Sequence, residues 1–135
     1  MTRFRIAFLG LALTTVVTTL LLAGPVFGSR HSSAEAEARS VTAEFFRSIN
    51  DRRYERTCAL LSRAYYRRYR ISSGRRCAIG LRIGFLWSQE IRFRITGVTV
   101  DADRVIVRAL ADRVPGRLVM IRERGLLKVL VVDGR

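Results

Sequence analysis

The spacing of apolar residues changes at Glu90, and this change limits the fold more than any other feature of the 135-residue chain. Before Glu90, apolar residues recur every three to four positions, which is typical of helices with one buried face. After it, Ile91, Phe93 and Ile95 alternate with arginines, which is typical of a strand with one buried face. The sequence therefore predicts an α+β fold, with helices packed on one face of a curved antiparallel sheet.

Three helices are predicted before the sheet. The first covers residues 34–50, the second residues 54–69, and the third begins at about Arg75. In the third helix, the apolar spacing places Cys77 and Trp87 on the inward face.

Three chain reversals are predicted after Glu90. Asp101–Asp103, Pro115-Gly116 and Arg124-Gly125 have the composition of turns. They divide the remaining sequence into about four strands, which would form an antiparallel meander.

An uncharged segment, Ile6–Gly24, follows Arg3 and Arg5 and is 19 residues long. This pattern is typical of an export signal, with small residues at Val26 and Gly28 before a cleavage point. It is also close to the roughly 20 residues that span a bilayer, so an uncleaved anchor with its N-terminus inside remains an alternative. Both interpretations place the rest of the chain outside the cytoplasmic membrane, anchored or secreted. The expected parts are a leader at 1–28, a tether at 29–35 and an extracytoplasmic domain at 36–135.

The sequence contains two cysteines, Cys58 and Cys77, which are predicted to lie on the inward faces of neighbouring helices. In an oxidising compartment, a pair of this kind favours a disulfide. Closing the loop would stabilise the fold by about 3 kcal/mol. Metal binding is disfavoured because the only histidine, His31, lies in the expected tether.

The chain has a formal net charge of +14, and its basic residues are arginine except for Lys128. A GC-rich genome is one explanation, and attraction to polyanions is another. Arginine and tyrosine are interleaved over residues 63–82. The candidate anion-binding residues there are Arg63, Arg67, Arg68, Arg70, Arg75 and Arg76, with Arg82 beyond them. Either these arginines bind anionic lipid or wall polymer, or they form a solvated face over inward tyrosines. Nucleic acid is a disfavoured partner for an exported chain.

Several motifs resemble exported bacterial members of the nuclear transport factor 2-like superfamily. They are Phe45-Phe46, Cys58-Ala59-Leu60-Leu61-Ser62, Cys77 and the segment Arg122–Val129. The resemblance covers roughly residues 36–132, although similar proteins usually carry Trp where Leu127 stands. It implies a cone-shaped fold with a pocket between helices and sheet. The superfamily includes enzymes, transport factors and non-enzymatic domains, so this fold does not specify an activity.

Candidate pocket-lining residues, which could equally be core, are Phe45, Ile49, Trp87, Phe93 and Ile95. No catalytic residue and no cofactor are predicted, because the folded region lacks histidine and a glycine-rich phosphate loop. Ketosteroid isomerase-like relatives imply one acid–base alternative, with Glu90 as base in a dry cavity and Tyr65 or Tyr69 as donor.

The sequence favours a non-enzymatic extracytoplasmic domain that binds a small apolar ligand or a partner protein of the cell envelope. The alternative is an electrostatic binder of anionic membranes or wall polymers through the arginines of residues 63–82. A ketosteroid isomerase-like enzyme is the minor alternative.

Overall fold

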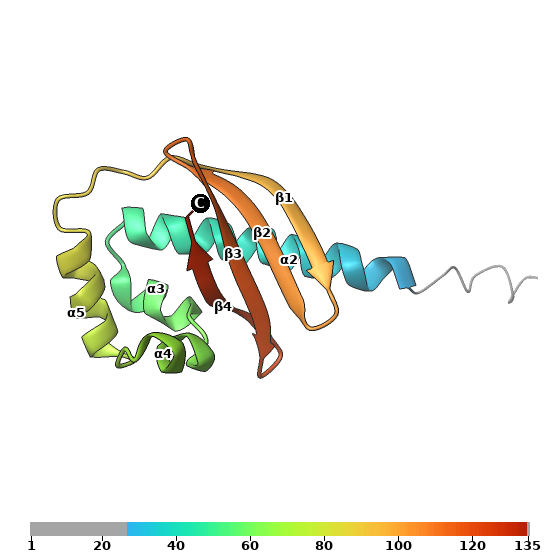
Figure 1. Ribbon diagram of the computed structural model, residues 1–135, viewed down its shortest axis with the longest axis horizontal. Coiled ribbons are helices and arrows are strands. Elements are labelled where there is room, and N and C mark those ends of the chain that lie inside the picture. The colour runs from blue at the N-terminus through green and yellow to red at the C-terminus, as the bar shows by residue number, and fades with distance from the viewer. Residues whose placement is uncertain (1–26, 135) are drawn as a thin grey trace, which may run out of the picture. The chain divides into compact units, whose positions relative to one another are not determined.

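The computed structural model describes residues 27–134, and the residues from His31 onward form one compact unit. Four helices precede four strands in this part of the chain (Figure 1). They are α2 (Phe27–Asn50), α3 (Tyr54–Leu60), α4 (Arg63–Tyr69), α5 (Arg75–Gly84), β1 (Phe93–Asp101), β2 (Arg104–Ala111), β3 (Val114–Glu123) and β4 (Leu126–Asp133). The predicted α+β order is confirmed. The apolar segment Ile6–Gly24 lies outside the described residues.

The sheet is an antiparallel meander with strand order β1-β2-β3-β4. In Figure 1, α2 crosses one face of this sheet, while α3, α4 and α5 gather beside the C-terminal end of α2. The arrangement is consistent with the predicted cone. The predicted reversals at Asp101–Asp103 and Arg124-Gly125 are confirmed, because Asp101 pairs with Arg104 and Glu123 pairs with Leu126.

The reversal predicted at Pro115-Gly116 was wrong. The chain turns at Asp112 and Arg113, which both adopt positive φ (49° and 71°), as a two-residue hairpin requires. Pro115 lies in β3 opposite Leu110 of β2. The pairing of β3 with β4 reaches only as far as Arg117, so the missing N–H of Pro115 costs no hydrogen bond to β4. A Cβ at Gly116 would lie 2.9 Å from the carbonyl oxygen of Asp133, so glycine permits this close approach.

The helix predicted over residues 54–69 is two helices that meet at Leu61 and Ser62. Leu61 forms a parallel bridge to Val129, and the Ser62 N–H donates to the Val129 carbonyl over 2.8 Å. The Ser62 hydroxyl then accepts from the Tyr65 N–H, which caps α4. The break therefore joins the helices to β4. Residues 29–35, the expected tether, are helical and form part of α2.

The core lies between α2 and the inner face of the sheet. Val107, Leu118, Met120 and Val129 are at most 2% exposed, and they meet apolar residues of α2. Phe46 of α2 stacks on Phe93 of β1 with 4.8 Å between ring centroids. Phe46 and Phe93 thus pack on each other in the region where the resemblance implies a pocket.

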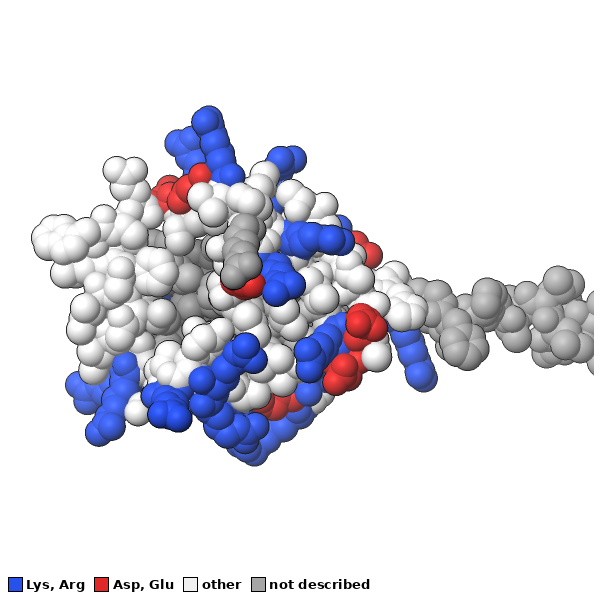
Figure 2. Space-filling model, in the orientation of Figure 1, with Lys and Arg blue, Asp and Glu red and all other residues white. Residues whose placement is uncertain are grey.

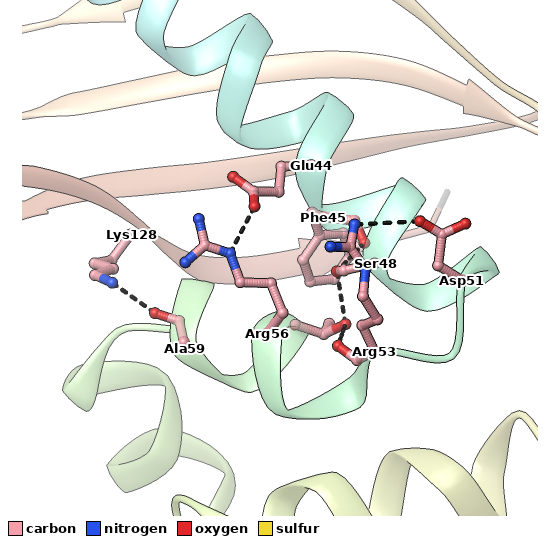
Figure 3. Close-up of polar contacts among 9 residues, drawn as sticks. Glu44, Phe45, Ser48, Asp51, Arg53, Arg56, Ala59 and Lys128 are labelled. Atoms are coloured by element: carbon pink, nitrogen blue, oxygen red, sulfur yellow. Dashed lines mark hydrogen bonds and ion pairs between the residues drawn. The ribbon is translucent and has the colours of Figure 1, made fainter.

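Polar side chains fix α2 to its neighbours (Figure 3). The Arg56 guanidinium of α3 donates a hydrogen bond from its Nε to the Glu44 Oε1 of α2 over 2.6 Å. This hydrogen bond lowers the pKa of the Glu44 carboxyl. Beneath it, the buried hydroxyls of Ser48 and Thr57 lie 2.7 Å apart. About two turns before Glu44 in the same helix, Glu37 accepts from the Leu127 N–H and from the Arg122 guanidinium of the β3–β4 hairpin.

Asn50, the last residue of α2, holds the segment that enters the sheet. Its amide nitrogen donates to the Ile91 carbonyl (3.0 Å), and its amide oxygen accepts from the Ile91 N–H (2.9 Å). Asn50→Ala should lower the free energy of unfolding by about 1–3 kcal/mol, because two part-buried backbone groups lose their partner. Chemical denaturation measures this loss. Ser88→Ala, which removes an exposed hydroxyl, is the control and should cost less than about 0.5 kcal/mol.

Candidate binding surface

Helix α5 is attached to α3 by a disulfide between Cys58 and Cys77, which confirms the predicted bridge. Both cysteines are 4% exposed, and Ala78 beside them is 2% exposed. The Tyr66 hydroxyl donates to the Cys58 carbonyl over 2.6 Å and lies 3.6 Å from the Cys77 Sγ. One face of α5 is therefore fixed against α3 and α4.

The opposite side of α5 exposes apolar side chains. Ile79 and Ile83 are 46% and 70% exposed, and Leu86 and Trp87, just after the helix, are 46% and 91% exposed. Ile79 and Ile83 are four residues apart and therefore lie on the same side of the helix. We call these four residues the α5 ridge. In Figure 2 the end of the domain formed by α5 is largely white, and its white side chains project from the surface.

The prediction that Trp87 faces inward was wrong. Helix α5 ends at Gly84, and Phe85, rather than Trp87, packs against the core. Because the chain leaves the helical path at this point, helical spacing no longer describes residue 87. The indole is left in solvent.

Exposed arginines border the α5 ridge. Of the predicted anion-binding residues, Arg63 pairs with Glu123 over 3.7 Å. The others, together with Arg82, form no ion pair within the described part of the chain, and we call them the α4–α5 arginines: Arg67, Arg68, Arg70, Arg75, Arg76 and Arg82. Figure 2 shows Lys and Arg side chains along the edge of the domain below the white end, over α4 and the start of α5.

The tyrosines of the Arg–Tyr segment differ in burial. Tyr65 and Tyr66 are half-buried and pack against the core, and burial raises the pKa of each. Tyr69 is 42% exposed, and its ring lies 4.6 Å from that of Tyr65. Tyr65 and Tyr66 thus match the interpretation in which tyrosines turn inward and arginines line an exposed face, whereas Tyr69 does not.

The five predicted pocket residues do not share a pocket. Phe45 and Ile49 are core residues, 7% and 6% exposed, and Phe93 and Ile95 are half-buried against that core. Ile49 borders a hollow of about 80 Å³, whereas Phe93 borders a separate surface groove of about 740 Å³. Trp87 borders neither of them.

A further groove, of about 730 Å³, lies between α3, the start of α5 and the β3–β4 hairpin. Its apolar residues include Ala59, Leu61 and Leu126, and charged residues such as Arg75 and Arg124 border it. Sequence reasoning missed this groove because its walls come from three separate segments.

The acid–base alternative finds no dry cavity at its expected base. Glu90 is exposed and borders the same groove as Phe93. Neither Tyr65 nor Tyr69 borders that groove. Within residues 27–134, no three histidine, cysteine or acidic residues are grouped closely enough to hold a metal ion.

Among the helices that the structure describes, none combines the length and the apolar character needed to cross a bilayer.

No protein-family model matches the chain, and no curated protein matches it. A crystal structure from Thiobacillus denitrificans, described as a calcium/calmodulin-dependent protein kinase type II association domain, does match. The TM-score is 0.53 at 16% identity, over 71% of this chain and 91% of that chain. The described domain has the nuclear transport factor 2-like fold. The α5 ridge and the α4–α5 arginines are thus surface features of a domain with the nuclear transport factor 2-like fold.

Proposed function

We propose that this nuclear transport factor 2-like domain is a non-enzymatic binding domain that docks on another macromolecular surface through the α5 ridge. The observation that carries the proposal is the exposure of Ile83 (70%), on a helix that a disulfide holds in place, and of Trp87 (91%), just after that helix ends. Clustered exposed apolar side chains are a recurrent mark of interaction sites. Each such side chain contributes about 1.5–3 kcal/mol when it is fully covered.

The packing between α2 and the sheet favours docking on another surface over enclosure of a ligand inside the cone. Phe45, Ile49 and the stacked pair Phe46–Phe93 occupy the space between α2 and the sheet. A small apolar ligand remains a second candidate, and the groove of about 730 Å³ beside α3 is where it would bind. The proposed setting is extracytoplasmic, which the Arg3–Gly24 segment and the disulfide support.

Photocrosslinking from the ridge tests the docking role. A photoreactive benzoylphenylalanine in place of Trp87, in the full chain in its native cells, should give adducts with a neighbouring molecule. The same residue in place of Val114, which is 58% exposed on β3, is the matched control and should give few. The masses of the adducts distinguish lipid from protein. Equal yields at the two positions, or none at position 87, would refute the docking role.

A further inference from the structure

We infer that the surface on which the α5 ridge docks is an anionic lipid bilayer. The inference rests on the docking role proposed above and names its partner. On α5, Arg75 and Arg76 lie one turn before Ile79, and Arg82 lies one turn after it. Apolar and cationic side chains therefore both occur on the exposed part of α5, and helices that lie at a membrane interface carry both kinds of side chain.

The charge of the surface favours an anionic partner. The α4–α5 arginines have no acidic partner among the described residues, and the whole chain carries a formal net charge of +14. A second copy of the chain would bring the same cations against the same cations. Basic residues near an anionic leaflet each strengthen binding by about fivefold.

The shape of the surface favours a bilayer over a protein groove. The ridge projects from the end of the domain (Figure 2), and its largest member is a tryptophan with its indole in solvent. Tryptophan is enriched at membrane interfaces, where an apolar ring and a polar N–H are both accommodated. A Cβ placed at Gly80 or Gly84 meets no atom within 4 Å, so the part of α5 next to the ridge is also open to solvent.

Trp87 reports directly on its own surroundings because it is the only tryptophan in the chain. The full chain is reconstituted in vesicles of phosphatidylglycerol with phosphatidylcholine, and separately in phosphatidylcholine alone. We expect Trp87 emission to move to shorter wavelength in the anionic vesicles and to be quenched by brominated acyl chains. In phosphatidylcholine, or at high salt, it should resemble that of an exposed indole, because salt screens the attraction.

Two variants separate the apolar and the electrostatic contributions. Ile83→Gln should lower the ratio of docked to undocked Trp87 by about tenfold, since an apolar contact is lost. Arg75→Gln with Arg76→Gln and Arg82→Gln should lower the ratio by about 100-fold. The matched control carries the same charge change on β2 and the turn after it, at Arg104, Arg108 and Arg113, and should stay within about twofold of the unmodified chain. Thermal unfolding confirms that each variant is folded.

The outcomes distinguish the inference from the docking role on which it rests. Identical Trp87 emission in the two kinds of vesicle would overturn the bilayer inference. An equal fall in the ratio of docked to undocked Trp87 in the α5 triple variant and in its control would also overturn it. If position 87 also crosslinks to a protein, docking stands with a different partner. If Trp87 stays in solvent and position 87 gives no adduct, both proposals fail.

Discussion

Replacing Cys58 and Cys77 together by alanine is expected to lower the free energy of unfolding by about 3 kcal/mol. The bond closes a loop between residues 19 positions apart, so its removal restores conformational freedom to the unfolded chain. A domain of this size is stable by only about 5–15 kcal/mol, so the loss is a large fraction of the total. Chemical denaturation of the oxidised chain and of the double variant measures it.

The loss should be concentrated at α5. Among the described helices and strands, α3 is the only one with which α5 makes an extended contact, and the disulfide crosses that contact. Hydrogen exchange should therefore accelerate more over Arg75–Gly84 than over β2 and β3, whose amides lie in the centre of the sheet. If docking depends on a fixed ridge, crosslinking from position 87 should fall in the same variant.

A reducing agent provides the control for this prediction. Dithiothreitol should destabilise the unmodified chain to a similar extent and should leave the alanine variant unchanged. If the variant and the oxidised chain unfold at the same denaturant concentration, the bond does not stabilise the domain. Uniform acceleration of exchange across α5 and the sheet would show that α5 does not open separately.

The period of the apolar residues was sufficient to predict the order of helices and strands, because one buried face dictates the spacing in both. It did not locate Trp87. A spacing of four residues leads from Leu81 to Phe85, whereas spacings of three residues lead from Leu81 through Gly84 to Trp87. Both spacings are typical of one face of a helix, so the sequence alone does not show which aromatic residue faces inward. Phe85 faces inward and Trp87 does not because α5 ends at Gly84. The position of this helix end depends on tertiary packing.

Other features depended on partners that are distant in sequence. Asn50 looked like a helix end, and the structure adds its two hydrogen bonds to Ile91, 41 residues away. Ser62 was placed inside a helix, although serine is a common N-cap, and its capping role follows from the contact of this segment with Val129. Pro115 resembled a turn residue because sequence does not show where β4 stops pairing with β3.

Phe46→Ala is expected to lower the free energy of unfolding by about 3–5 kcal/mol, whereas Trp87→Ala should change it by less than about 0.5 kcal/mol. Phe46 is 7% exposed and contacts both Phe45 and Phe93, so truncation removes stacking and leaves a cavity between α2 and the sheet. Trp87 is 91% exposed and loses little packing when it is shortened. Chemical denaturation of the two variants provides the comparison.

This contrast separates residues that fold the domain from residues available for binding. If Phe46 lined an open pocket, its truncation would cost little stability and would alter ligand binding instead. If Trp87 were covered by the rest of the chain, its truncation would cost several kcal/mol, as for a buried aromatic. A large loss at Phe46 and a negligible loss at Trp87 would show that the cone interior is core. The energy of docking would then have to come from the α5 ridge, where exposed apolar side chains remain available for burial.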